Sequence, residues 1–573
     1  MEMKRVISAI SAALLLQLGA FAQEDLNPTV TVTNTYQGEA YGIVKPAQLI
    51  QIPDSVSRFN LDFDYSVFES PYKSTYEFQP YDVKIRPQSQ EAHDGRLYVK
   101  AGAGYTLHPD FHAVYVPLSK PGGSFSIFAD HDSYFGNYWN YKKIGTGDMV
   151  VLKDPDNRTN QAGRYGFTDI GIRGRKAWSG GEFTSALAWN NVFSGINRNT
   201  PFTRSANYGS LDANIRSFDP MASFKYDIGL QVRAGVDAYP TGQMTVTEAR
   251  LDGDLGVLFI GQHRLSLGVR TDLQFLAQDD NAYSGVVGLI PRDEFRLGEW
   301  DMSVGLGILA LVCNDPALPS APPLPTMFNK KGQWVYPQVL VSRSFAQDRF
   351  FIEAGFTSGV KYESYWDLVE ENPFWSLACG PLLDNTVERM NLFAGARGSL
   401  GDNLQFKLKG GFRMVENDRL WEAVADASGS TDLLQHYGYG DYNQLYANIG
   451  MEWLKEPFQA SLDMTAGKTW LKDGQSVFAP APFEGKLSAG YHWGERARAG
   501  MNLSWKTNRE ATLGGNMVSI PGYADLGLYG EFFWRRDLAV FLNCGNLLNQ
   551  TVMIAPFIAE RGVSCTAGII FKM

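Results

Sequence analysis

The stretch Asp402–Val415, which reads DNLQFKLKGGFRMV, decides the fold. It alternates between an apolar set, Leu404, Phe406, Leu408, Gly410, Phe412 and Met414, and a polar or small set, Gln405, Lys407, Lys409, Gly411 and Arg413. Successive side chains of a strand point to opposite faces, so this segment has one apolar face and one charged face. Similar segments of about ten residues, enough to cross a bilayer as a tilted strand, recur along the chain. They predict the strands of a closed barrel in an outer membrane.

The connections between these segments alternate between short and long. We mark about 22 segments from Arg96 onward, an even number, as in bacterial outer-membrane barrels. Tight connections such as Leu400–Asp402 follow even-numbered segments, whereas long ones such as Ser133–Arg164 and Glu363–Thr386 follow odd-numbered segments. Short periplasmic turns and long outer loops are typical of such barrels. The pattern predicts an all-β, transmembrane antiparallel barrel over residues 96–573. The alternative, a secreted soluble β-protein, does not predict this alternation.

The first residues have the features of a secretory signal. Lys4 and Arg5 supply a positive end, an apolar core follows, and a small-residue motif ends at Ala22. Such a segment is removed during export, and we expect cleavage between Ala22 and Gln23. An uncleaved anchor helix, the alternative, needs a longer apolar run. Residues 1–22 are therefore a predicted signal peptide, which places the mature chain in the cell envelope of a Gram-negative bacterium.

The region 23–95 shows no sustained strand pattern. Prolines recur through it with polar residues between them, which is typical of an extended linker rather than a folded domain. We expect a periplasmic N-terminal arm that leads into the first strand. Within the arm, Thr29, Val30, Thr31, Val32 and Thr33 form a short β-prone island.

Charge and cysteine content exclude some classes of protein. The formal net charge of −10 argues against nucleic acid as a partner. Four cysteines in 573 residues do not make a disulfide scaffold. Cys313 and Cys379 fall at or in long loops on the same predicted side and could pair. Cys544 and Cys565 lie on the last two predicted strands and could also pair. For both pairs we favour free buried thiols. Without a CxxC motif or a Cys/His cluster, the sequence predicts no metal site and no cofactor.

One stretch contains residue types of a hydrolase. His131-Asp132-Ser133 has the side chains of a catalytic triad. Adjacency in the sequence is not triad geometry, however, and no GxSxG or HExxH motif is present. We therefore assign no catalytic residue and expect that the protein is not an enzyme.

The end of the chain carries two motifs. Asn546-Leu547-Leu548-Asn549 ends one predicted strand, and Ser564–Met573 forms an amphipathic last strand. Both are similar to the final strands of TonB-dependent outer-membrane receptors. That family usually ends in an aromatic residue, which is read by the barrel-assembly machinery. Here Met573 is last and Phe571 lies one same-face position earlier, so these two residues are the expected assembly signal.

A narrower resemblance covers most of the mature chain. Arg96–Tyr105, Leu26–Thr33 and Glu371-Asn372-Pro373-Phe374 look like segments of receptor-like barrels that lack the plug domain. The arm is too short and too polar for the folded plug of the family. In the family, TonB pulls on the plug through a short N-terminal box, and the resemblance implies that Thr29–Thr33 is such a contact. The alternative is that this island is a piece of arm lying along the barrel rim.

Three functions stay open at this point. The first is a receptor-like transporter of an unknown ligand, with Tyr134, Tyr138, Trp139 and Tyr141 of a long outer loop as candidate ligand contacts. The alternative role of these aromatics is the girdle that contacts outer-membrane lipids. The second function is a structural or assembly component bound to other periplasmic envelope proteins, and the third is a passive porin. Because an empty lumen of this size would leak, we expect folded-in loops, the arm or a partner to fill it.

Overall fold

The computed structural model describes residues 96–573 apart from internal gaps at 106, 121, 140, 145–147, 152–160, 197–201, 220–221, 240–241, 260–262, 278–280, 315–331, 347–348, 376–384, 426–430, 473–479, 514–515, 556–557 and 561. The predicted signal peptide with its cleavage point at Ala22 and Gln23, the predicted arm and the island Thr29–Thr33 lie outside the described residues. No helix in the described part of the chain is long and apolar enough to cross a membrane.

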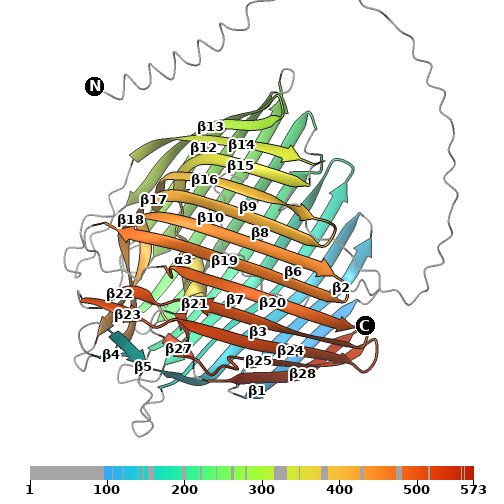
Figure 1. The fold of residues 1–573 in the computed structure, drawn as a ribbon, viewed down its shortest axis with the longest axis vertical. Helices are drawn as coiled ribbons and strands as arrows, with labels where there is room; N and C mark the ends of the chain where they lie inside the picture. Colours follow the sequence, from blue (N-terminus) through green and yellow to red (C-terminus); the bar gives the residue numbers. More distant parts are fainter. Residues whose placement is uncertain are drawn as a thin grey trace, which may run out of the picture. The chain divides into compact units, whose positions relative to one another are not determined.

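The strands form one sheet that closes on itself as an antiparallel barrel of 22 strands (Figure 1). The wall consists of β1 (Leu97–Tyr105), β2 (Asp110–Lys120), β3 (Gly123–Trp139), β6 (Gln161–Trp178), β7 (Gly181–Ile196), β8 (Phe202–Ser217), β9 (Phe224–Tyr239), β10 (Gly242–Leu258), β11 (Arg264–Ala277), β12 (Asn281–Leu297), β13 (Trp300–Asn314), β14 (Gly332–Phe345), β15 (Phe350–Lys361), β16 (Thr386–Leu400), β17 (Leu404–Ala425), β18 (Thr431–Lys455), β19 (Phe458–Leu471), β20 (Phe483–Trp493), β21 (Ala497–Lys506), β24 (Tyr523–Phe533), β25 (Leu538–Gly545) and β28 (Ser564–Lys572). Pairing of β28 with β1 closes the ring. Long connections carry three further hairpins: β4 (Tyr141–Ile144) with β5 (Asp148–Val151), β22 (Arg509–Leu513) with β23 (Asn516–Ile520), and β26 (Val552–Ala555) with β27 (Ile558–Glu560).

The first and last residues of the barrel sequence meet at the rim that carries the short turns. The backbone N–H of Leu97 donates to the carbonyl of Met573, and that of Met573 donates to the carbonyl of Leu97, both at 2.8 Å. The turn from β16 to β17 shows why these connections are so short. Gly401 has φ +65° there, a backbone conformation that glycine adopts without the steric penalty of a Cβ. Each predicted segment overlaps one wall strand, so the predicted barrel and its strand count are confirmed.

The alternation in the sequence separates the lumen from the membrane face. On β17 the side chain of Leu408 is 39% exposed on the outer face, whereas Lys409 is 7% exposed. The ammonium of Lys409 lies 3.7 Å from the ring centroid of Phe393, on the neighbouring strand β16. Other strands also carry exposed apolar side chains on their outer face, among them Ile127, Ile170, Leu187, Leu211, Leu230 and Leu289. Because the sheet is closed, it has no free edge at which backbone N–H and C=O groups would lack partners. Lipid can therefore cover this apolar face.

Several wall strands run further than predicted. β3 continues to Trp139 and β6 begins at Gln161, so the predicted loop Ser133–Arg164 is shorter than expected. β17 likewise runs past Val415, where the predicted strand Asp402–Val415 ends, to Ala425. Outside the membrane, one face of a strand need not be apolar, so these extensions carry no alternation that the sequence could reveal.

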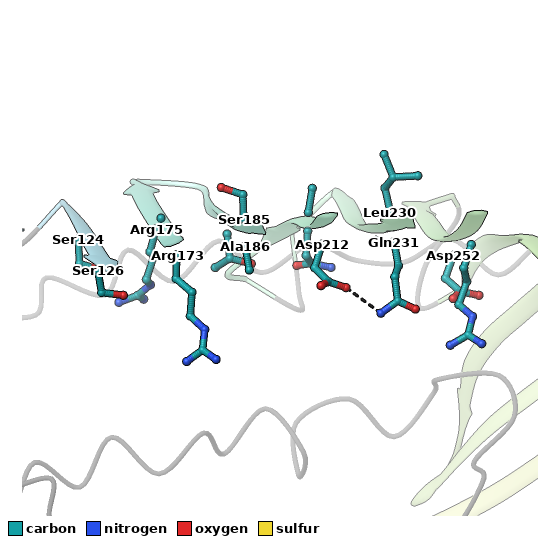
Figure 2. Close-up of a pocket in the computed structure, with 16 residues that line it drawn as sticks. Ser124, Ser126, Arg173, Arg175, Ser185, Ala186, Asp212, Leu230, Gln231 and Asp252 are labelled. Carbon is teal, nitrogen blue, oxygen red and sulfur yellow. Dashed lines mark hydrogen bonds between the residues drawn. The ribbon is translucent and has the colours of Figure 1, made fainter. Parts of the chain in front are cut away.

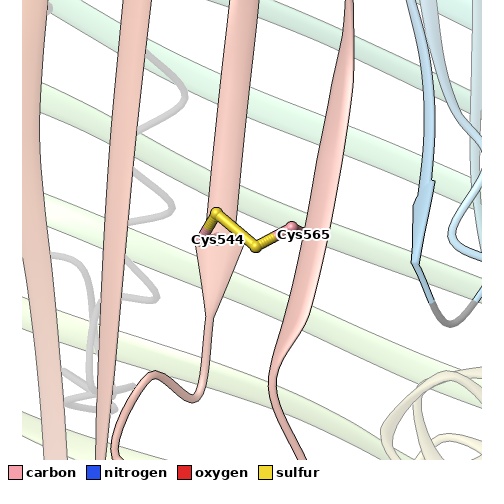
Figure 3. The surroundings of a disulfide bond; sticks show 2 residues. All are labelled: Cys544 and Cys565. Carbon is pink, nitrogen blue, oxygen red and sulfur yellow. A yellow bond between two sulfur atoms is a disulfide. The ribbon is translucent and has the colours of Figure 1, made fainter.

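Cys544 of β25 and Cys565 of β28 are joined by a disulfide bond (Figure 3). The two residues lie directly opposite each other in the ladder, with their Cα atoms 4.1 Å apart. The structure thus differs from the free thiols favoured for this pair, because the register of the last hairpin could not be derived from the sequence. Cys313 lies in β13, but its side chain and the whole of Cys379 lie outside the described residues.

Candidate functional site: a loop folded into the barrel

The connection after β15 enters the lumen, although the sequence predicted an outer loop there. Residues 363–375, called the lumen insert here, contain the helix α3 (Tyr365–Glu371). The insert packs on Tyr208 of β8, which lies on the strand face opposite the exposed Leu211 and so faces the lumen. Its apolar side chains are at most 1% exposed: Tyr365, Trp366, Leu368, Val369, Phe374 and Trp375. The insert is therefore packed like a protein core.

The local sequence explains the helix. The hydroxyl of Ser364 accepts a hydrogen bond from the backbone N–H of Asp367 at 3.1 Å, which is an N-cap arrangement. The buried residues of α3 are spaced so that they share one face of the helix. The helix ends ahead of Pro373, because the residue before a proline is disfavoured in the α conformation.

Aromatic rings hold the insert against the wall. The ring of Trp366 stacks on that of Tyr208 with centroids 4.3 Å apart. Tyr365 lies edge-on to both Trp366 and Trp375, at 5.4 Å in each case. The same cluster contains the wall residues Val192, Ala206, Tyr239, Met244, Val246, Leu276, Ala282 and Tyr439. Truncation of a buried tryptophan to alanine costs about 3–5 kcal/mol, so this cluster is a large part of the docking energy.

The carboxylate of Glu248, on β10, binds the first residues of the insert. It accepts hydrogen bonds from the backbone N–H groups of Tyr365 at 2.6 Å and Trp366 at 3.2 Å, and from the hydroxyl of Ser364 at 2.8 Å. Glu248 is 4% exposed. A buried carboxylate needs such donors to offset its desolvation, so wall and insert stabilise each other here.

Arg233, on β9, links the wall to the exposed side of α3. Its guanidinium lies 2.9 Å from the Glu248 carboxylate and donates to Asp367 and to the Ser364 hydroxyl at 2.6 Å each. Burial acts to raise the pKa of the Asp367 carboxyl, but the neighbouring guanidiniums, Arg233 first, outweigh burial and hold that pKa below its usual value. Asp367 is therefore a charged anchor of the insert.

A fully buried ion pair anchors the other side. The guanidinium of Arg204 lies 3.1 Å from the carboxylate of Asp237, and neither side chain is exposed. The insert adds hydrogen bonds to this pair, because the Tyr365 hydroxyl donates to Asp237 at 2.6 Å and Arg204 donates to the carbonyl of Pro373 at 3.1 Å. A buried ion pair whose other polar atoms lack partners is costly. Withdrawal of the insert is therefore opposed by the wall itself.

Two further carboxylates of the insert contact the wall. The Tyr208 hydroxyl donates to Glu370, and Arg419 lies 3.5 Å from Glu363. Burial raises the pKa of the Glu370 carboxyl and that of Glu363. The side chains of Asp367 and Glu370 keep 53% and 45% exposure, so α3 presents an acidic face to the lumen.

A cavity of about 610 Å³ lies on the lumen face of β3 and β6–β10. Its lining includes the polar residues Ser124, Ser126, Arg173, Arg175, Asp212, Asn214, Gln231, Arg250 and Asp252. In Figure 2, Arg173 and Gln231 point to the same side of the sheet, while Leu230 points to the other. Gln231 donates to Asp212 at 2.8 Å. The guanidinium of Arg250 lies 3.8 Å from Asp367, so the cavity adjoins the insert.

The structure corrects the expected position of Tyr134. This residue is not in an outer loop but in β3, where it is 1% exposed. Its ring lies 5.7 Å from that of Tyr165, which in turn lies 6.2 Å from Phe374 of the insert. The other candidate ligand contacts, Tyr138 and Trp139 in β3 and Tyr141 in β4, have side chains outside the described set.

The predicted assembly signal lies at the closing strand. Phe571 is 37% exposed and pairs with Val99 across the β28–β1 seam. Met573 is 73% exposed at the end of the chain. Their outward position agrees with the predicted same-face arrangement, and their role as an assembly signal stays a prediction.

The residues that hold the insert are not predicted by the sequence pattern. Glu371–Phe374 was noted only as a family-like motif, and the partners Arg204, Arg233, Asp237 and Glu248 were not singled out. A local signal was present, because a helix cap at Ser364 followed by many aromatic residues up to Trp375 is unusual for a solvated loop. Among the described residues, no group of three or more His, Cys, Asp or Glu side chains is placed to hold a metal ion.

Comparison with known proteins identifies the fold. No protein-family model matches the chain, and no curated protein matches its sequence. The FrpB iron transporter from Neisseria meningitidis superposes with a TM-score of 0.58 at 8% identity, over 83% of this chain and 81% of that one. The copper transporter OprC gives 0.56 at 13% identity, over 84% and 80%. A mutant of the ferric enterobactin receptor PfeA from Pseudomonas aeruginosa gives 0.54 at 12% identity, again over 84% and 80%. This chain therefore has the fold of TonB-dependent receptor barrels.

Proposed function

We propose that this protein is a receptor-like transport barrel of the outer membrane that has no separate plug domain and takes a ligand yet to be identified. The observation that carries the proposal is the lumen insert, which the wall holds through Glu248, Arg233 and the Arg204–Asp237 pair. Transporters and receptors of the same fold support a role in transport. In this role the chain moves a solute rather than converting it.

The insert would supply part of the closure that a plug supplies in the receptor family. It is held by specific contacts to β8, β9, β10 and β17 of the wall, and its acidic face adjoins a polar cavity on the lumen side. The signal peptide 1–22 would direct export, and the arm 23–95 would lie in the periplasm. There the island Thr29–Thr33 would be available to TonB.

The insert weighs against a passive porin, because it occupies part of the lumen. A structural or assembly component is the remaining alternative. It predicts stable co-purification with other envelope proteins and a barrel that stays closed however the insert is changed.

Single-channel recording in planar bilayers tests the proposal. We expect the intact protein to be silent and a variant with residues 364–375 replaced by a Gly/Ser linker to show large conductance steps. Replacement of residues 473–479, between β19 and β20 in the sequence, by the same kind of linker is the matched control and should stay silent. A large pore in the intact protein would contradict the proposal and favour the passive porin. Silence of the insert variant, of an arm deletion (23–90) and of the two combined would favour the assembly component.

A further inference from the structure

The outer face of the barrel carries a histidine and a serine that transport does not use. His131 and Ser133 are two residues apart on β3, so they lie on the same face of the strand. That face is the one of the exposed Ile127, and the opposite face carries the cavity-lining Ser124 and Ser126. Both side chains therefore point away from the lumen and toward the membrane.

Hydrogen bonds arrange these side chains in a defined order. Nε2 of His131 lies 2.9 Å from Oγ of Ser133, and Nδ1 lies 2.8 Å from Oγ1 of Thr168. Thr168 sits opposite His131 on β6. With its proton on Nδ1, the imidazole donates to Thr168 and accepts the Ser133 hydroxyl proton at Nε2. A nucleophile, a base and a group that orients the base thus follow one another.

His131 and Ser133 lie at the outer edge of the band of apolar side chains that faces the membrane. In the ladder, Thr168 pairs with Asn191, and the row beneath contains Trp189, which is 46% exposed. Exposed tryptophans mark the membrane–water interface of such barrels. Ser133 is also about ten residues from the start of β3 at the short-turn rim, or about 25 Å of height for a strand tilted by about 40°. This is the level at which the ester groups of outer-leaflet lipids lie.

Apolar rings surround the serine. Phe135 and Phe193 flank it with ring centroids 6.0 Å apart. The ring of Phe193 lies over Gly166, where an added Cβ would stand 2.5 Å from the ring and 2.7 Å from the Ser133 Cβ. Gly166 thus makes the room that lets the ring cover Ser133, which is 1% exposed. An acyl chain is the kind of group that can replace such a ring without admitting water.

We propose that Ser133, His131 and Thr168 form a membrane-facing acyl-transfer site that acts on the carboxylic esters of lipids. Ser133 Oγ attacks the ester carbonyl carbon as Nε2 of His131 accepts the hydroxyl proton. The bond from that carbon to the alcohol oxygen breaks, and the alcohol leaves with the proton from His131. Water, deprotonated by His131, then hydrolyses the acyl-serine to a carboxylic acid and restores Ser133.

Thr168 is a positioning residue in this scheme. Its hydroxyl fixes the tautomer and orientation of the imidazole, but it is neutral and does not compensate the imidazolium charge as a carboxylate does. Turnover is therefore slow, and the acyl-serine accumulates. The site lies on the opposite face of the wall from the lumen insert, so it is independent of the transport function.

The test uses the full-length protein in phosphatidylcholine vesicles, with release of fatty acid and labelling by a fluorophosphonate probe as readouts. We expect the protein to release fatty acid and to carry the label on Ser133, located by mass spectrometry. Ser133→Ala and His131→Asn should each lower release by about 100-fold or more, since general-base catalysis alone contributes about that much. Ser205→Ala is the matched control, because Ser205 lies in the same outward ladder row and should leave both readouts unchanged.

Two further variants separate the role of Thr168 from a merely structural one. Thr168→Val should lower labelling of Ser133 about 10-fold, and Thr168→Ser should restore it, with all variants folded as judged by heat-modifiable migration in gels. Equal fatty acid release by the unmodified protein and Ser133→Ala would overturn the proposal. So would the absence of both release and label from the unmodified protein.

Discussion

Removal of the Glu248 carboxylate should release the lumen insert. In Glu248→Ala, the backbone N–H groups of Tyr365 and Trp366 and the hydroxyl of Ser364 lose their common acceptor. Arg233 loses one of its two close carboxylates and keeps Asp367 at 2.6 Å. Apart from this cross-strand ion pair the wall keeps its contacts, because position 248 takes part in the β9–β10 and β10–β11 ladders through its backbone.

The size of the effect follows from burial. Deleting one partner of a buried ion pair costs about 3–5 kcal/mol, and each buried N–H left without an acceptor costs about 1–3 kcal/mol. These costs overlap, and Arg233 keeps one partner, so we expect a loss of about 4 kcal/mol in docking free energy. At about 1.4 kcal/mol per factor of ten, the undocked insert becomes about 1,000-fold more populated.

Amide hydrogen exchange of the native protein measures this population. Exchange in the peptide that covers residues 363–375 should accelerate by about 100- to 1,000-fold in Glu248→Ala, and by less in Glu248→Gln, which keeps an acceptor oxygen. Asp252→Asn, on the same strand and in the cavity lining, is the control and should leave this peptide unchanged. Unchanged exchange in Glu248→Ala, or an equal acceleration in the wall strands, would refute the reasoning.

Three more predictions concern the insert and the closing hairpin. Trp366→Ala removes the ring stacked on Tyr208 and should cost about 3–5 kcal/mol of docking, seen as frequent openings in bilayer recordings; a record as silent as that of the unmodified protein would contradict this. Because the pKa of Asp367 is lowered, its ion pair with Arg233 stabilises docking above the usual carboxyl pKa of about 4 and is lost as pH falls through the lowered value. Exchange of the insert should therefore rise at strongly acid pH, and Asp367→Asn should remove that dependence. Replacement of Cys544 and Cys565 by serine opens a loop with a sequence separation of 21 and should lower unfolding stability by about 3 kcal/mol, seen as a lower midpoint of heat modification; an unchanged midpoint would count against a stabilising bond.

The membrane face of the barrel could be predicted because its rule is local. Lipid requires apolar side chains on every second residue of each strand, and neighbouring residues such as Leu408 and Lys409 already show it. Strand ends beyond the membrane, as in β3 and β17, are under no such requirement, so the alternation predicts strands that are shorter than the real ones. The site was less predictable: the sequence places Tyr134 in a long outer loop, but in the structure it lies in β3 and is buried beside Tyr165.

The sequence by itself determined that this chain is a barrel, how many strands it has and which rim carries the short turns, because each of these depends on periodicity and spacing within one segment or between adjacent ones. Only the tertiary structure decided what lies in the lumen and what lies on the outer face. Glu248 and Tyr365 are 117 residues apart, and His131 and Thr168 are 37 apart. Such pairs meet through strand register and through the course of a loop, which are set by the closed sheet as a whole and by no local pattern.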